Sequence, residues 1–370
     1  MPYKNPLIPV PGTYNNESKP AFGHISGFMK IYFDHWFWFW TQKIIISFHT
    51  TEGKGIFAIS LMKILMKSKN ILSGSVRKRR RIRVLLAALT VLVVIYMAGA
   101  LHGRFNFKYT RVDIEYNKLP AALEGFTIVH ISDLHLISFN RHPGKLAAVT
   151  DSINALEADI IVNTGDFVTL HYDEMEPFTG TLGRLRAKHG VYAIPGNHDT
   201  GLYSKKYNKD NYHEHLDVMG SVLRAAGHIY LQDSTAMVKF NEVSLSLTGV
   251  ATYGRVPDLS YGDLDSSLLG NDSSSFRILL SHDPNHWVRE IQERSDIDLT
   301  LSGHTHGMQM GILFPGFQLS PASLLYPAWS GLYGENGNYL YVNRGLGTIG
   351  MPARIGMPPE ITIITLKTKD

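Results

Sequence analysis

The chain of 370 residues contains no cysteine and little charge. Without cysteine there can be no disulfide bond, no thiolate-ligated zinc site and no cysteine nucleophile, although the redox compartment stays undecided. Charged residues make up 18% of the chain, and the formal net charge is only +4. Much of that positive excess lies in one run, RKRRRIR at residues 77–83. Because the rest of the chain has no dense basic stripe, we expect no nucleic-acid partner.

Long hydrophobic runs are also rare, and the clearest one directly follows the basic run. Residues 84–101 (VLLAALTVLVVIYMAGAL) carry no charge. As a helix they would be about 27 Å long, close to the hydrocarbon thickness of a bilayer. We therefore predict a basic juxtamembrane segment at residues 66–83 and a transmembrane helix at residues 84–101 of a single-pass protein of the cell (inner) membrane. The basic run predicts a cytoplasmic N-terminus and an extracytoplasmic C-terminal domain.

Three alternatives to this topology stay open. AGA at residues 98–100 has the form of a signal-peptide cleavage site, which fits a secreted or envelope protein. HGRFNFKYTR at residues 102–111 is also basic and weakens the charge bias, so a cytoplasm-facing domain fits as well. A buried helix of a soluble protein is the third alternative, but such a helix is rarely apolar on every side.

Residues 1–65 do not resemble the rest of the chain. The stretch IYFDHWFWFWTQKIIISF at residues 31–48 is rich in aromatics but includes Asp, His and Lys, which are costly inside a bilayer. We predict no second span there. We leave residues 1–65 as an uncertain N-terminal extension, and one hypothesis is that it is not native and that the natural start is Met62 or Met66. A peptide from residues 1–30 in material from the natural source would refute this interpretation.

From residue 104 to residue 370 the pattern predicts one α/β domain with a central sheet covered on both faces. Apolar runs that read as strands are FTIVHIS, ADIIVN, VYAIP, FRILLS, IDLTLS, YLYVN and EITIITL. Two amphipathic helices lie between them: one carries Leu146, Val149, Ile153 and Leu156 on a single stripe, and the other carries Leu216, Met219 and Leu223.

Polar side chains follow five of these strands, where α/β folds build their sites. They are Asp133 and His135, Asp166, Asn197 with His198 and Asp199, His282, and His304 and His306. Each alone has an ordinary explanation as a helix N-cap, a turn or a buried core histidine. Carboxylate, imidazole and amide groups at five strand ends together indicate a metal site.

These motifs, D-x-H, GD, GNHD, H and GHxH in order over residues 125–366, resemble those of the calcineurin-like metallophosphoesterases. The resemblance implies a four-layer α/β/β/α sandwich, preceded here by the membrane segment. GHTHGMQ, YLYVNRGLG and PPEITIITL make the chain similar to a membrane-associated bacterial branch, that of the cell-wall and lipid phosphodiesterases and the chlamydial-type UDP-2,3-diacylglucosamine pyrophosphatase.

The resemblance also implies two divalent metal ions. Asp133, His135, Asp166 and His306 would hold the first, and Asp166, Asn197, His282 and His304 the second, with Asp166 as the bridge. An oxygen and nitrogen shell without thiolate suits Mn, Fe, Zn, Co or Mg, and the sequence does not choose among them. The implied reaction is attack on phosphorus by a metal-activated hydroxide.

Three further residues have candidate roles that follow from their own chemistry. His198 would protonate the leaving group, and Asp199 would accept from its ring and hold its tautomer. Arg344 would bind substrate phosphate, with a structural salt bridge as the equal alternative. His130 and Asp283 have no role in the family pattern, and we interpret them as structural.

The expected substrate is a phosphodiester, pyrophosphate or phosphomonoester that is lipid-linked or associated with the envelope, because the membrane segment lies close to the domain. Residues 253–275 could form a lid over the site or a plain loop. A nuclease of the same superfamily and a metal-binding membrane scaffold without activity remain as alternatives. The sequence indicates no protein partner.

Overall fold

The computed structural model describes residues 75–205, 212–252, 262–268, 276–335 and 337–369. The extension at residues 1–65 and most of the loop at 253–275 lie outside the described residues. The chain divides into two compact units, and the second begins at Gly99. Helix α4 (Val76–Leu101) contains the basic run and the uncharged run, and by length and composition it could cross a membrane.

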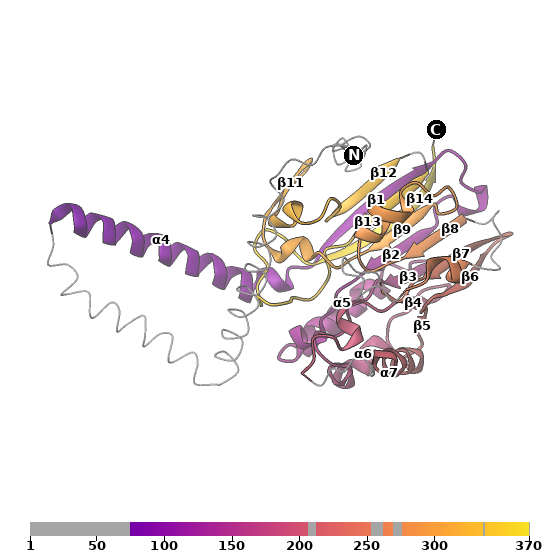
Figure 1. Cartoon of the computed structure of the whole chain (residues 1–370), viewed down its shortest axis with the longest axis horizontal. Coiled ribbons are helices and arrows are strands. Elements are labelled where there is room, and N and C mark those ends of the chain that lie inside the picture. The colour runs from indigo at the N-terminus through magenta and orange to yellow at the C-terminus, as the bar shows by residue number, and fades with distance from the viewer. Residues whose placement is uncertain (1–74, 206–211, 253–261, 269–275, 336, 370) are drawn as a thin grey trace, which may run out of the picture. The chain divides into compact units, whose positions relative to one another are not determined.

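The second unit contains two six-stranded sheets (Figure 1). The first has the order β1 (Lys108–Tyr116), β14 (Glu360–Thr368), β2 (Thr127–Ile131), β3 (Ile160–Asn163), β4 (Val191–Ala193) and β5 (Ile229–Tyr230). All neighbours in it are parallel except β14 and β2. The second has the order β12 (Gly331–Glu335), β13 (Asn338–Val342), β9 (Leu299–Ser302), β8 (Phe276–Leu280), β7 (Val243–Gly249) and β6 (Ser234–Phe240). Its four inner strands are parallel and its two edge pairs antiparallel.

Successive side chains of each strand point to opposite faces of its sheet, and this alternation divides the core into layers. Ile128 and Ile160 of the first sheet pack with Leu299 and Leu301 of the second, so one face of each sheet meets the other. The opposite face of the first sheet is covered by α5 (Pro143–Asn154), α6 (Thr179–Leu182) and α7 (Tyr212–Ala225), which lie together on one side of it in Figure 1. The opposite face of the second sheet is covered by the helical turn η8 (Trp287–Ile291) and α8 (Leu264–Leu268). This arrangement confirms the four-layer α/β/β/α sandwich.

Every apolar run predicted as a strand forms one, and both predicted helices form. Leu146, Val149 and Ile153 of α5 are buried as predicted, whereas Leu156 is only half-buried. The sequence pattern missed β5, β6, β7 and β12, and it missed β1, whose residues alternate between exposed and buried because it is an edge strand. It also missed the small hairpin of β10 (Ile312–Phe314) and β11 (Phe317–Leu319), which pairs with neither six-stranded sheet in the described part of the chain.

Candidate metal centre

Five parallel strands from the two sheets end at one edge of the sandwich, and the predicted residues follow them there. Asp133 and His135 follow β2, Asp166 follows β3, Asn197 follows β4, His282 follows β8, and His304 and His306 follow β9. Five of these residues have left-handed backbone conformations, with φ of 51° at Asp133, 40° at His135, 57° at Asp166, 72° at His304 and 54° at His306. Such conformations are strained in residues other than glycine and are typical of functional sites.

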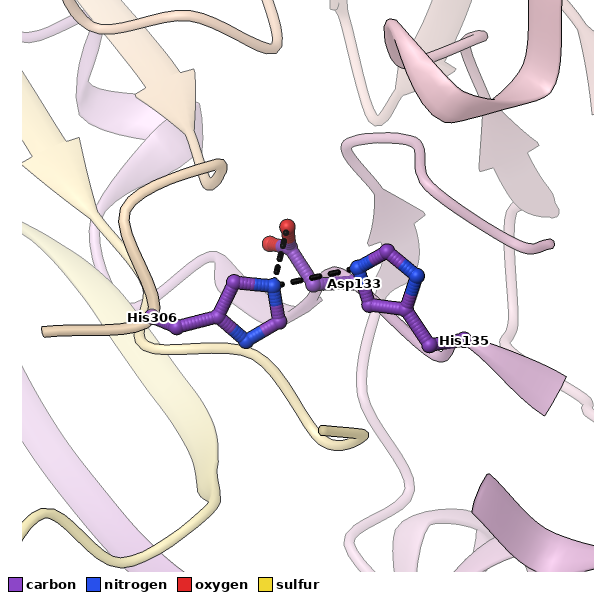
Figure 2. Close-up of side chains that lie close together, drawn as sticks. All are labelled: Asp133, His135 and His306. Carbon is purple, nitrogen blue, oxygen red and sulfur yellow. Dashed lines mark hydrogen bonds and ion pairs between the residues drawn. The ribbon is translucent and has the colours of Figure 1, made fainter. Parts of the chain in front are cut away.

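Asp133, His135 and His306 form a first cluster (Figure 2). His306 Nε2 lies 3.2 Å from Asp133 Oδ1 and 3.1 Å from His135 Nε2. All three side chains are buried. A carboxylate and two ring nitrogens therefore point at one place that bulk water does not reach.

Asp166, His282 and His304 form a second cluster, to which Asn197 adds an amide oxygen. His282 Nε2 lies 3.2 Å from Asp166 Oδ2 and 3.2 Å from His304 Nδ1. Asn197 Oδ1 lies 2.8 Å from the same Nδ1. Asp166 Oδ2 is also 3.6 Å from His135 Nε2 of the first cluster. One carboxylate oxygen therefore lies between the two clusters.

The donor atoms have the spacing that a shared cation requires. Ligand atoms about 2.1 Å from one ion lie roughly 3.0–3.4 Å from one another, and the contacts of 3.1 Å and 3.2 Å within the clusters match this. The far nitrogens of the rings have other partners: His135 Nδ1 faces the Thr169 hydroxyl at 3.1 Å, and His282 Nδ1 donates to the Thr164 carbonyl at 2.7 Å. Such contacts leave Nε2 of each ring free to bind a metal, so these residues suit a divalent metal ion.

The electrostatics of the site also favour a cation. Burial alone would lower the pKa of His282, but the carboxylates of Asp166 and Asp133 raise it to about 10. Burial likewise opposes the ionised form of Asp133, yet His306 and His282 hold the pKa of that carboxyl well below its usual range. Two buried carboxylates thus create a negative potential that positive charge must balance.

Two glycines allow these loops to approach closely. A Cβ atom at Gly196 would collide with the side chain of Asp166, and one at Gly303 would collide with Ser132 and Asp133. Gly303 precedes His304, whose backbone N–H donates to Asp133 Oδ2 at 3.0 Å. The loops after β2 and β9 are therefore held together directly at the first cluster.

Comparison with known proteins agrees with this geometry. The family model described as calcineurin-like phosphoesterase matches residues 126–308, which include all the predicted metal ligands. The chain is 32% identical over 322 residues to a transmembrane protein with metallophosphoesterase domain from Danio rerio, covering 83% of this chain and 68% of the relative. It is 31% identical over 287 residues to the uncharacterized metallophosphoesterase YkuE of Bacillus subtilis (strain 168), covering 73% of this chain and 93% of the relative.

The chain belongs to the calcineurin-like metallophosphoesterase family. It is therefore a phosphoester hydrolase, as its motifs predicted. An uncharacterized metallophosphoesterase of Aquifex aeolicus (strain VF5) is also 31% identical over 266 residues, covering 71% of this chain and 91% of the relative. The transmembrane relative and helix α4 together indicate membrane association of this metallophosphoesterase.

His198 lies beside both clusters of the metallophosphoesterase site. Its backbone N–H donates to Asp166 Oδ1 at 2.9 Å, and its ring stacks on Tyr203 with centroids 4.0 Å apart. Its Nδ1 donates to the Thr169 carbonyl at 2.7 Å, which leaves Nε2 for chemistry. Burial lowers the pKa of His198, while the Asp166 carboxylate and the Thr169 hydrogen bond act in the opposite direction.

Asp199 does not hold the His198 ring as the sequence predicted. Its carboxylate is fully buried and accepts from three backbone N–H groups, those of Asp166 and Gly196 at 2.8 Å and Val168 at 3.0 Å. The ring partner is the Thr169 carbonyl instead. Burial raises the pKa of Asp199 to about 8, although the backbone donors oppose the shift. Asp199 therefore fixes the loop that carries Asp166.

Arg344 forms a buried salt bridge, the alternative to the predicted phosphate contact. Its guanidinium lies 3.1 Å from Glu360 Oε1 and donates to Ser330 Oγ at 3.0 Å. This pair joins β14 to the loop after β13. These contacts engage Nη1 and Nη2 of the guanidinium, whereas Nε has no partner among the described residues. The salt-bridge alternative is therefore present, and the phosphate contact stays a prediction.

Sequence reasoning missed three residues beside the ligands. Thr169 contacts both His135 and His198, and Tyr326 Oη lies 3.1 Å from His304 Nε2. Arg354 is buried, donates to backbone carbonyls of the loop after β13, and has Nη2 3.2 Å from His306 Nδ1. Burial and the nearby Arg344 guanidinium lower the pKa of Arg354 to about 9. None of the three lies in a recognisable motif, so nothing in the sequence alone indicates them.

Proposed function

We propose that this metallophosphoesterase hydrolyses a lipid-linked or envelope-associated phosphoester with two divalent ions at the paired clusters. The observation that carries this proposal is the position of Asp166 Oδ2, which lies 3.2 Å from His282 Nε2 and 3.6 Å from His135 Nε2. A single carboxylate oxygen shared between two histidine clusters suits a bridging ligand, because it offsets the repulsion of two neighbouring cations.

The chain would contribute separate groups to the reaction. Bound divalent ions would supply positive charge for the phosphoryl oxygens and activate water for attack. Asp133, His135 and His306 would hold one ion, and Asn197, His282 and His304 the other, with Asp166 shared. Which of Mn, Fe, Zn, Co or Mg would be bound depends on the availability of each metal and on the coordination geometry of the site.

His198 would act as the general acid of the reaction. The Thr169 carbonyl fixes Nδ1 as the donor, so a second proton on Nε2 can pass to the departing oxygen. The negative charge of a bound phosphoester would reinforce the effect of Asp166 and favour the protonated ring. No nucleophile from the chain is needed.

Hydrolysis of bis-p-nitrophenyl phosphate by the purified protein with added Mn²⁺ tests the proposal. We expect turnover that a chelator abolishes and that metal restores. The absence of turnover with Mn²⁺, Zn²⁺, Co²⁺, Fe²⁺ and Mg²⁺ would favour the scaffold alternative. Preferred cleavage of single-stranded DNA would favour a nuclease, and phosphate release from a membrane-lipid extract would narrow the physiological substrate.

We also propose that α4 anchors the protein with its C-terminal domain outside the cytoplasm. The basic residues at the start of α4 support this orientation. The test is a reporter enzyme, fused to the C-terminus, that works only outside the cytoplasm. We expect this fusion to show reporter activity. A cytoplasmic, protease-protected domain would contradict the proposal and favour a UDP-linked lipid as the substrate, since such nucleotides occur on that face.

A further inference from the structure

One surface segment of the domain has no charge at all. No Asp, Glu, Lys or Arg occurs between Asp298 and Glu335, and the hairpin of β10 and β11 lies within this interval. Several apolar side chains of the interval are well exposed. In the hairpin Ile312 is 46%, Phe317 52% and Leu319 51% accessible, and after the hairpin Leu324 is 84% accessible. Large apolar groups gathered on a surface are typical of an interaction site.

The pairing of the hairpin puts Ile312, Phe317 and Leu319 on one face. Ile312 pairs with Leu319, and the next pair on the same face contains Phe317. The intervening residue of β10, Leu313, points the other way and packs against the buried cluster of Ala322, Trp329 and Met357. The hairpin is therefore anchored by its inner face and presents an apolar outer face.

The base of the hairpin touches the metal centre. It starts a few residues after His306, and Ser320 Oγ at its end donates to the Gly307 carbonyl at 2.6 Å. Further along the same uncharged interval, Tyr326 Oη lies 3.1 Å from His304 Nε2. The uncharged segment therefore extends from the hairpin to the second cluster.

The hairpin is also linked to the place where α4 ends. The Arg354 N–H donates to the Gly99 carbonyl at 3.2 Å, and Gly99 belongs to the last turn of α4. The next residue, Ile355, accepts at 2.9 Å from the N–H of Gly311, which directly precedes β10. One short loop thus connects the end of the candidate membrane helix with the start of the hairpin.

We propose that the outer face of this hairpin is a second membrane contact, which inserts into the interface of the lipid bilayer beside the end of α4. The occupant is lipid because the apolar face adjoins the point at which a membrane helix would emerge, and because phenylalanine and leucine without charge suit the boundary between headgroups and acyl chains. This inference rests on the proposed function: the contact would let a membrane phospholipid reach the candidate metal centre from the bilayer along the uncharged segment, past Tyr326.

The absence of cysteine makes a direct test available, because a single introduced cysteine can carry an environment-sensitive fluorophore. The label is placed at Phe317→Cys in the full-length protein reconstituted in phosphatidylglycerol and phosphatidylcholine vesicles. The control is Glu242→Cys, in the exposed turn between β6 and β7 at an outer edge of the second sheet. We expect nitroxide-labelled lipid to quench the label at 317 and aqueous iodide to quench only the label at 242.

Two results of this measurement would overturn the proposal. Equal quenching of both labels by iodide would mean that the hairpin lies in water. Protection of the label at 317 from both quenchers would mean that protein covers it, either a second copy or another part of the chain. Neither result depends on catalysis, so this arm stays decisive even if the protein hydrolyses no phosphoester and the proposed function fails.

An activity measurement tests the consequence for substrate delivery. Phosphatidyl-p-nitrophenol in vesicles and soluble bis-p-nitrophenyl phosphate share a leaving group and differ in presentation. Phe317→Ser with Leu319→Ser should lower the rate on the vesicle substrate about tenfold, because apolar side chains no longer draw the site to the interface, and should leave the soluble substrate unaffected. Met237→Ser, which removes an exposed apolar side chain from β6, should change neither rate. Equal rates before and after the double change, or equal losses on both substrates, would contradict the proposal.

Discussion

The two clusters of the candidate metal centre differ in their exposure to solvent. In the first cluster the side chains of Asp133 and His135 are 0% exposed and that of His306 is 4% exposed. In the second cluster His282 is 1% exposed, but the His304 side chain is 20% exposed and contacts the hydroxyl of Tyr326. The first cluster is therefore enclosed by protein, and the second is partly exposed to solvent at His304.

The difference follows from what surrounds each cluster. Arg354 and the loop after β13 close off His306, and the Thr169 hydroxyl covers the far side of His135. Around His304 the chain supplies Asn197 and a tyrosine at the edge of the uncharged segment. We therefore predict that a cation held by the first cluster exchanges more slowly than one held by the second.

The largest effect is expected from Asp166→Asn, which should break both clusters at once. The change removes the negative charge between them, so both sites should lose metal and activity should fall by about 10³-fold or more, since several kcal/mol of charge stabilisation are lost. Metal analysis of the purified variant, beside its rate on bis-p-nitrophenyl phosphate, measures both effects. Two bound equivalents with full activity would refute the assignment of two metals.

His198→Asn should separate the chemistry from metal binding. With p-nitrophenolate, a stable leaving group, the rate should fall little; with an alkyl or lipid alcohol it should fall on the order of 10²- to 10⁴-fold, as expected for a lost general acid. Metal content should stay normal, because the ring is not a proposed ligand. An equal loss on both substrates together with lost metal would make His198 a ligand or a structural residue.

Asp199→Asn should act through the position of Asp166. An amide keeps one acceptor oxygen and brings an N–H₂ group toward the three backbone donors, so the loop after β3 should shift. We expect a loss of about 10- to 100-fold in metal affinity or activity, which is usual for residues that support ligands. The loss should be equal for good and poor leaving groups, in contrast to His198→Asn, and a dependence on the leaving group would restore the pairing of Asp199 with the ring.

Removal of single ligands should sharpen the comparison of the clusters. His135→Ala and His304→Ala should each affect mainly one of the two equivalents of metal, because each ring belongs to one cluster. The metal that remains in His304→Ala is held by the first cluster, and the metal that remains in His135→Ala is held by the second. We expect the former to resist dialysis against a chelator for longer. Equal loss rates in the two variants would show that burial of the first cluster does not control exchange.

Arg344→Met should leave the catalytic constants nearly unchanged and lower stability. Breaking a buried ion pair from one side typically costs about 3–5 kcal/mol, and the partner left behind is Glu360. Arg344→Met combined with Glu360→Gln should recover part of that loss in thermal unfolding. A raised KM with unchanged stability would instead support the predicted phosphate contact.

The sequence by itself determined the α/β class, the membrane helix candidate and the set of groups at the site, whereas its pattern predicted one covered sheet where the structure has two. These features are local: a strand is recognised by its own apolar residues, and Asp133 or His304 is recognised by its place directly after such a strand. Edge strand β1 and the hairpin of β10 and β11 escaped recognition because short or half-exposed strands lack a continuous apolar run.

Only the tertiary structure decided which partner each side chain has. Asp199 has a neighbouring histidine in the sequence, yet its carboxylate is bound by backbone N–H groups that include those of Asp166 and Val168 on another loop. Arg344 pairs with Glu360 on β14, and the end of α4 meets Arg354 far along the chain. Such contacts depend on how the two sheets bring distant loops to one edge, and because many arrangements would satisfy the same local pattern, no spacing in the sequence selects among them.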